Sequence, residues 1–183
     1  MSFPGIPSLD AAVMAFIQTH FHNTVTDTVF PIITSLGEAG IGWIVLSLVL
    51  LCFKKTRRTG GLVLIAMTVT LLFGELTLKN IICRLRPCNV FTDFPMLIAR
   101  PTSYSFPSGH TSSSFAAALI LTLRHKKVGW LAYIPAVLIA FSRIFLFVHY
   151  PTDVLAGILL GTLAALLLSL IHISEPTRRT PIS

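Results

Sequence analysis

The sequence predicts an all-α integral membrane protein, a bundle of about six transmembrane helices with an N-terminal interfacial helix. Hydrophobic residues make up 54% of the 183 residues and charged residues only 11%, far from the quarter-charged average of soluble domains. Apolar runs recur from about residue 41 to residue 173 with short polar breaks. Their lengths of roughly 16 to 24 residues suit a hydrocarbon core about 30 Å thick.

The first predicted element is the amphipathic stretch at residues 8–21. Leu9, Val13, Phe16 and Ile17 fall on one helical stripe with polar residues opposite. This pattern is typical of a helix that lies in the membrane interface. We therefore expect this helix to lie on the membrane and not to cross it.

The weakest candidate span covers residues 24–36, because it is short and contains Asp27 and Pro31. Stronger apolar runs follow, and they cover residues 38–53, 60–83, 109–123, 128–149 and 152–172. Residues 1–173 are thus expected to form a single membrane domain. Residues 174–183 lack this pattern, and we expect them to be a non-native or disordered tail.

Basic residues cluster in two loops that are two spans apart and therefore lie on the same side of the membrane. Because lysine and arginine favour cytoplasmic loops, we expect a multi-pass protein of the cell membrane with the loop at 84–108 on the outer face. The net charge of +7 then reflects topology and an anion site, and not a nucleic-acid-binding face. The two clusters are Lys54, Lys55, Arg57 and Arg58, and Arg124, Lys126 and Lys127.

Polar residues at membrane depth are costly and usually functional, and the first such segment follows the span at 60–83. Lys79 and Arg86 are seven residues apart, so on a continuing helix they share one face, and Pro87 would stop that helix. Two cations on one face can clamp a phosphate, the arginine through its fork and the lysine as a point charge. Glu75, one turn before Lys79, could pair with it or simply pack.

The second segment reads as the start of a helix. Pro107 fixes the entry, Ser108 suits the cap, and Gly109 lets a ligand approach the backbone closely. The free amides at a helix start attract anions. His110 in the first turn would stand beside a bound phosphate, where it could donate a proton to a leaving oxygen.

The third segment contains Arg143, His149 and Asp153. If His149 and Asp153 lie about one turn apart, the carboxylate can accept from one imidazole nitrogen and leave the other free to attack. The six-residue step from Arg143 to His149 would not align them on a regular helix, so the chain must leave helical geometry before His149.

Simpler interpretations exist for several of these residues. A hydrogen bond between His149 and Asp153 could merely close a turn. We interpret Arg84 and Arg100 as side chains that snorkel to the lipid headgroups. The three cysteines show no spacing that suits zinc, and no metal site is predicted.

Taken together, the three segments resemble the signature of the type-2 phosphatidic acid phosphatases, which glucose-6-phosphatase and the vanadium haloperoxidases share. No position of that signature is missing, and the six-span layout extends the similarity to nearly the whole chain except the tail. The matching residues are Lys79, Arg86, Pro87, Pro107, Ser108, Gly109, His110, Ser142, Arg143, His149 and Asp153.

The resemblance implies a metal-independent phosphatase without a cofactor. His149 would attack phosphorus to give a phosphohistidine, Asp153 would orient it, and His110 would protonate the leaving group. The phosphoryl oxygens would be held by Lys79, Arg86, Ser108, Gly109 and Arg143.

The expected substrate is a lipid phosphate in the bilayer, with undecaprenyl pyrophosphate as the best candidate because an outer-face site suits recycling of a carrier lipid. Phosphatidylglycerophosphate and phosphatidic acid are alternatives. A lipid phosphotransferase would use the same residues, and the sequence does not separate it from a hydrolase. A non-enzymatic protein that binds anionic lipid is disfavoured, because both His149 and His110 are present. The sequence leaves the oligomeric state open.

Overall fold

The computed structural model describes residues 3–173, and every regular element in that range is a helix. The all-α prediction is therefore confirmed, while the prediction for residues 174–183 lies outside the described residues. The elements are α1 (Ser8–His20), α2 (Thr24–Leu36), η1 (Glu38–Gly40), α3 (Ile41–Cys52), α4 (Arg57–Thr70), η2 (Leu71–Leu78), α5 (Lys79–Ile82), α6 (Pro87–Val90), α7 (Gly109–Arg124), η3 (Gly129–Ala132), α8 (Tyr133–Phe145) and α9 (Pro151–Ile173).

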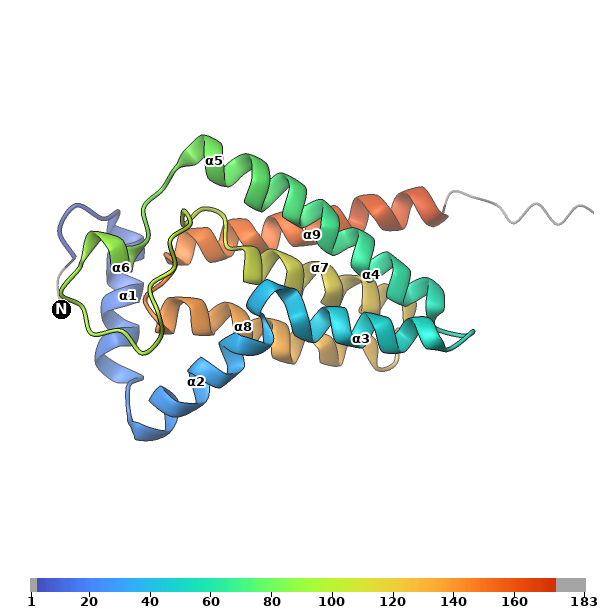
Figure 1. Ribbon diagram of the computed structural model, residues 1–183, viewed down its shortest axis with the longest axis horizontal. Coiled ribbons are helices and arrows are strands. Elements are labelled where there is room, and N and C mark those ends of the chain that lie inside the picture. Colours follow the sequence, from blue (N-terminus) through green and yellow to red (C-terminus); the bar gives the residue numbers. More distant parts are fainter. Residues whose placement is uncertain (1–2, 174–183) are drawn as a thin grey trace, which may run out of the picture.

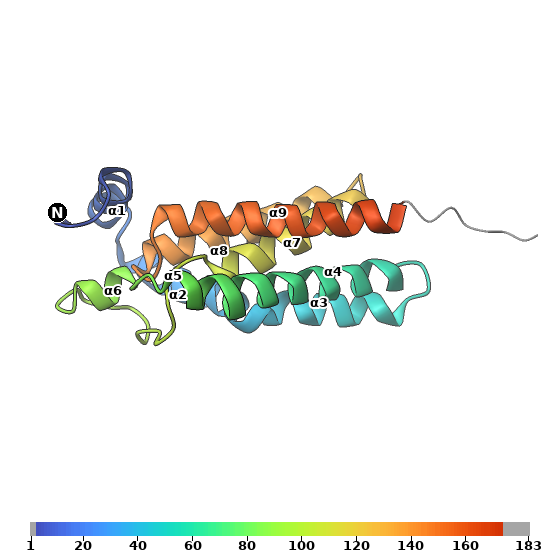
Figure 2. The same cartoon turned by 90° about the horizontal axis from the view of Figure 1, so that it is seen from above.

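Helix α7 lies at the centre of the bundle, in contact with α4, α8 and α9, and α3 packs on α4 (Figures 1 and 2). Two glycines of α9 bring α9 and α7 together. A Cβ atom at Gly161 would lie 2.2 Å from the carbonyl oxygen of Ser112, and one at Gly157 would lie 2.7 Å from that of Ser108. Such close contact between backbones is how small residues hold membrane helices together. The start of α7 is thereby fixed against α9.

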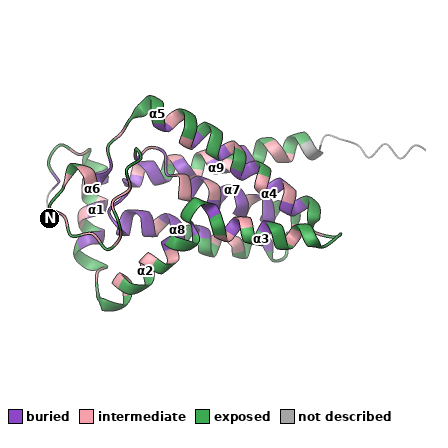
Figure 3. Cartoon of the chain, in the orientation of Figure 1, coloured by how far each residue is buried: buried purple, intermediate pink, exposed green. Residues whose placement is uncertain are grey.

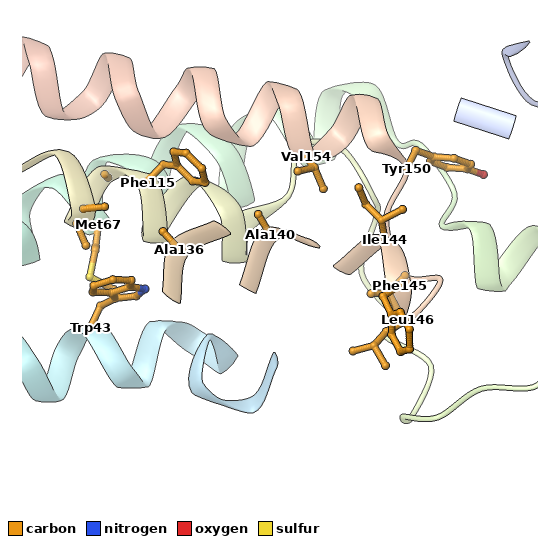
Figure 4. Packing of buried hydrophobic residues seen from close by; sticks show 14 of the residues in the cluster. Trp43, Met67, Phe115, Ala136, Ala140, Ile144, Phe145, Leu146, Tyr150 and Val154 are labelled. Atoms are coloured by element: carbon orange, nitrogen blue, oxygen red, sulfur yellow. The ribbon is translucent and has the colours of Figure 1, made fainter. Parts of the chain in front are cut away.

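Buried residues lie on the inward faces of the helices, and exposed residues lie on the outside (Figure 3). Trp43 of α3 and Met67 of α4 belong to this core (Figure 4), and the Trp43 indole donates to the Ser114 hydroxyl across 2.9 Å. On the outside of α9, Leu159, Leu163 and Leu167 are each more than half exposed, and they lie one turn apart. An exposed apolar stripe of this kind is expected where lipid replaces water.

The predicted helices are present with bounds close to those expected, but the count of six spans is not confirmed. Within residues 3–173, Arg57–Val90 and Pro151–Ile171 are long and apolar enough to cross a membrane, and Thr24–Leu36 with Glu38–Cys52 would form one more span bent by 45°. The apolar helix Gly129–Phe145 is shorter. Helix α7 has only 16 residues. Because other helices surround α7, it can carry serines at positions where a lipid-facing helix carries leucines.

Helix α4 continues through the π-helical turns of η2 into α5, which ends at Ile82, before the stop expected at Pro87. Cys83, directly after Ile82, takes the left-handed conformation (φ 50°) and stops the helix. Arg86 is extended, as a residue before proline prefers to be, and Pro87 begins α6. The expectation that one continuing helix carries both Lys79 and Arg86 is therefore wrong.

Helix α1 packs across one end of the bundle against α8 and α9 (Figure 1), and only part of the stripe expected at the membrane interface is exposed, because Ile17 is buried. Leu9 and Phe16 remain more than half exposed, where they can reach the membrane interface. The inward face mixes polar and apolar residues because it contacts polar groups of the bundle end. Its buried side chains are Asp10, Met14, Ile17 and Gln18.

Candidate active site

Three parts of the chain at one end of the bundle carry the predicted site residues: α5 with its connection to α6, the start of α7, and the end of α8 with its connection to α9 (Figure 1). A cavity of about 1080 Å³ lies among them. Ser108 and Asp153 do not line the cavity, and both are completely buried behind it. The predicted residues that line it are Lys79, Arg86, Gly109, His110, Arg143 and His149.

His149 is placed by the abrupt end of α8. The amide of Phe147 donates to the carbonyl oxygen of Ile144 (3.0 Å) and the next amide to that of Arg143 (3.2 Å), which is the bond pair of a Schellman cap. Phe147 holds a left-handed φ of 59°, which is strained for a bulky residue. Its buried ring stacks on Phe94 with centroids 3.9 Å apart, and this packing stabilises the turn. The chain thus leaves helical geometry before His149, as the spacing predicts.

The imidazole of His149 has two different neighbours. Arg86 Nη1 lies 2.9 Å from Nε2, and because arginine can only donate, Nε2 accepts and Nδ1 carries the proton. Nδ1 lies 3.4 Å from Asp153 Oδ2, which is longer than a hydrogen bond. Because Nε2 accepts a hydrogen bond, the ring is neutral, and the Nε2 lone pair becomes available to an electrophile in the cavity once Arg86 Nη1 donates to another acceptor.

Asp153 is held by several donors from different parts of the chain. Its Oδ2 accepts from the backbone amide of Tyr150 (2.9 Å) and from the Ser105 hydroxyl. Its Oδ1 accepts from Arg84 Nη1 (2.7 Å), and the other arm of Arg84 donates to Asp10 Oδ2 (2.7 Å). The interpretation of Arg84 as a snorkelling side chain is therefore wrong.

Three cations of the cavity wall are buried: Lys79, Arg86 and Arg143 are 5%, 3% and 3% exposed. Lys79 Nζ lies 2.6 Å from both carboxylate oxygens of Glu75, so this pairing is confirmed. Arg143 Nη1 donates to the Thr34 hydroxyl (2.5 Å), and its Nε has no hydrogen-bond partner among the described residues. A buried, partly unsatisfied positive cluster is costly by itself, and a bound phosphate would offset that cost.

Helix α7 begins at Gly109, as the sequence predicts, so its first amides have no acceptor within the helix and can bind an anion. A Cβ atom at Gly109 would lie 2.1 Å from Glu75 Oε1, so only glycine lets this helix start approach the Glu75–Lys79 pair without displacement. His110 Nε2 lies 3.5 Å from Glu38 Oε2 and makes no hydrogen bond within the described chain. Its imidazole is thus free for a proton transfer in the cavity.

Ser108 takes the N-cap position of α7, but its side chain does not cap the helix. Its hydroxyl accepts from the Thr111 hydroxyl (2.9 Å), and its amide donates to the carbonyl oxygen of Asp153 (3.1 Å). Ser108 therefore ties the start of α7 to the start of α9, behind the cavity wall.

The structure places several residues at the site for which the sequence gives no signal or a different one. Arg100, interpreted above as snorkelling, instead lines the cavity and donates to the carbonyl oxygens of Thr92 (2.6 Å) and Phe94 (3.0 Å). This interpretation is wrong as well. Residues at the site that carry no sequence signal, because their partners lie far along the chain, include Asp10, Thr34, Glu38 and Ser105.

The cavity extends from the cations into an apolar region bounded by α2, α3, α4 and η2. This region offers room for a hydrocarbon chain next to a charged head group. Its lining includes Pro31, Ile44, Leu64, Met67 and Leu71.

Comparison with known proteins identifies the family. Residues 59–175 match the PAP2 superfamily model. The chain is 37% identical over 138 residues to an undecaprenyl-diphosphatase of Sulfolobus acidocaldarius (75% of this chain, 66% of that protein), so it spans about two thirds of that relative's length. It is 34% identical over 139 residues to the bacitracin transport permease protein BcrC of Bacillus licheniformis (74% and 68%).

Among solved structures, the chain resembles a transmembrane PAP2-type phosphatidylglycerolphosphate phosphatase from Bacillus subtilis. The TM-score is 0.76 at 29% identity, with 97% of this chain and 90% of that chain covered. The family match includes all three polar segments that form the cavity. This chain therefore belongs to the PAP2 superfamily.

Proposed function

We propose that residues 1–173 form a membrane lipid phosphatase that removes the terminal phosphate of a lipid pyrophosphate, with undecaprenyl pyrophosphate as the best candidate. The observation that carries this proposal is one continuous cavity with buried cations and two histidines at one end and apolar walls at the other. Such a space suits a molecule with an anionic head and a hydrocarbon tail. The name of one relative, an undecaprenyl-diphosphatase, supports the pyrophosphate substrate, and that of the structural neighbour, a phosphatidylglycerolphosphate phosphatase, supports the broader class of lipid phosphatase.

In the first step, His149 Nε2 attacks the terminal phosphorus. A P–N bond forms as the P–O bond to the leaving lipid phosphate breaks, which gives a phosphohistidine. A phosphoryl oxygen would take the place of Nε2 as acceptor of the Arg86 Nη1 hydrogen bond. Asp153 faces the Nδ1 proton and stabilises the positive charge that develops on the ring.

His110 donates a proton to the leaving oxygen and then accepts one from the water that hydrolyses the phosphohistidine. This second step releases inorganic phosphate and restores Nε2. Lys79, Arg86 and Arg143 stabilise the charge on the phosphoryl oxygens, assisted by the Gly109 amide. We propose that Ser108 contributes by placing that amide, because its own hydroxyl is bound to Thr111.

We also propose that the cavity opens at the outer face of the membrane. The α3–α4 and α7–η3 connections carry the two basic clusters and lie at the end of the bundle opposite the proposed site (Figure 1). Because basic loops favour the cytoplasm, the opposite end faces outward. An outer site would act on lipid carriers after they have delivered their cargo.

The test is phosphate release by the pure protein in detergent, with undecaprenyl pyrophosphate, phosphatidylglycerophosphate and phosphatidic acid as substrates. His149→Ala should abolish release, whereas His20→Ala, a change of the same kind at an exposed residue of α1, should not. Full activity of the His149 variant would overturn the mechanism. The substrate with the highest kcat/KM identifies the lipid class.

A lipid phosphotransferase is the second candidate, because a phosphohistidine can pass its phosphoryl group to a lipid or sugar hydroxyl as well as to water. Product analysis with and without an acceptor separates the two functions. Phosphate found on the acceptor, with little free in solution, would favour transfer.

A further inference from the structure

A chain of polar contacts connects helix α1 to the proposed nucleophile. Asp10 of α1 has no exposed surface. Its Oδ1 accepts from the amide of Thr152 (2.9 Å), and its Oδ2 accepts from the Thr152 hydroxyl and from Arg84 Nη2 (2.7 Å each). Arg84 Nη1 donates to the same hydroxyl and to Asp153 Oδ1, again at 2.7 Å.

Arg84 is suited to join two carboxylates. Its planar fork directs one arm at Asp10 and the other at Asp153, which the single nitrogen of a lysine cannot do in the same geometry. The guanidinium also lies over the Tyr150 ring, 3.8 Å from its centroid, and this contact fixes its plane.

The two oxygens of Asp153 therefore have different partners. Arg84 holds Oδ1, while Oδ2 faces Nδ1 of His149 at 3.4 Å. Rotation of the carboxylate about its Cβ–Cγ bond would break the first contact, so Arg84 restricts the orientation in which Oδ2 meets the imidazole.

Neither Asp10 nor Arg84 lines the cavity, whereas the three proposed phosphate ligands Lys79, Arg86 and Arg143 do. A phosphate in the cavity is thus held without Asp10 or Arg84. Any effect of these two residues on the reaction must pass through Asp153 and its neighbours.

We propose that Asp10 and Arg84 are positioning residues: through Arg84 and Thr152, helix α1 fixes the Asp153 carboxylate so that His149 keeps its Nε2 directed into the cavity. Helix α1 is then part of the catalytic apparatus as well as an interfacial helix. This inference rests on the proposed function, because it assigns the network to the same nucleophile.

The test compares kcat and KM for undecaprenyl pyrophosphate in the full chain. Asp10→Asn keeps the shape of the side chain but removes the charge that holds Arg84. It should lower kcat about tenfold, equivalent to about 1.4 kcal/mol, with KM within about twofold because the phosphate ligands are untouched. Arg84→Gln should lower kcat about 100-fold. The double variant should fall less than about twofold below Arg84→Gln, since the two residues act as one unit.

The matched control is Asp27→Asn. Asp27 of α2 pairs with His22 across 2.7 Å and has no contact with the network, so kcat should stay within about twofold of the unmodified protein. If Asp10→Asn does not fold, Thr152→Val provides a second test. The Thr152→Val change removes only the hydroxyl that joins Asp10 and Arg84. It should also lower kcat and leave KM unchanged.

The proposal would be overturned if Asp10→Asn had the same kcat as the Asp27→Asn control. If Asp10→Asn does not fold, the same result in Thr152→Val would overturn it. So would fully multiplicative losses in the double variant, which would mean that Asp10 and Arg84 act separately. Failure of the proposed function looks different: the unmodified protein would release no phosphate, or His149→Ala would remain active.

Discussion

Replacing Arg86 with lysine separates the charge of the site from its geometry. Arg86 donates to Ser103 through Nε (2.8 Å) and Nη2 (3.0 Å), and its Nη1 contacts the Val148 carbonyl oxygen and His149 Nε2 (2.9 Å each). A lysine keeps the positive charge, but its one nitrogen cannot reach acceptors on both sides of the fork. The loss of two charge-assisted hydrogen bonds at about 1.5 kcal/mol each is about 3 kcal/mol. We therefore expect kcat/KM to fall by about 100-fold.

The assay is the initial rate of phosphate release from undecaprenyl pyrophosphate at a substrate concentration well below KM. Arg124→Lys serves as the control, because Arg124 is an exposed arginine at the opposite end of the bundle, and its replacement should leave the rate unchanged. If Arg86→Lys kept more than about a third of the kcat/KM of this control, charge alone would suffice and the argument from the fork would be wrong.

Three further predictions concern the proton donor, the cations and the turn before the nucleophile. His110→Ala should lower hydrolysis of phosphatidic acid by on the order of 1000-fold but that of nitrophenyl phosphate by less than about tenfold, because an alkoxide leaving group needs a proton and nitrophenolate does not; equal losses would contradict this role. EDTA should leave phosphate release unchanged, since the proposed positive charges belong to the protein, and a loss that Mg²⁺ restores would refute this. Phe147→Ala should destabilise the protein by about 3 kcal/mol and lower kcat, because the buried ring holds the turn before His149; an unchanged melting temperature would contradict the packing argument.

Much of the fold follows from local sequence. Apolar runs, and residues such as Pro107 and Gly109 that start helices, are read directly from the chain, and the helices lie close to where these signals put them. The number of spans cannot be predicted from local sequence, because hydropathy reports contact with lipid. Helix α7 instead packs against other helices and carries buried serines such as Ser112 and Ser114. The early stop at Cys83 also lacks a sequence signal, because that residue adopts a conformation that glycine normally takes.

For the site as well, local sequence predicts some residues, and tertiary contacts determine the others. Arg143, His149 and Asp153 lie within eleven consecutive residues, so their spacing could be interpreted without a structure. Asp10 could not be assigned, because its partners Arg84 and Thr152 are 74 and 142 residues away. Contacts of that kind arise from tertiary packing, which a single sequence does not show.

The most direct test of the account is to trap the covalent intermediate. Undecaprenyl pyrophosphate labelled with ³²P in its terminal phosphate is mixed with excess protein, and the reaction is quenched with alkali within milliseconds. We predict a protein-bound, acid-labile label that maps to the peptide containing His149 and is absent in His149→Ala. Phosphate release at the full single-turnover rate with no label on the protein, or a label on another residue, would contradict a histidine nucleophile.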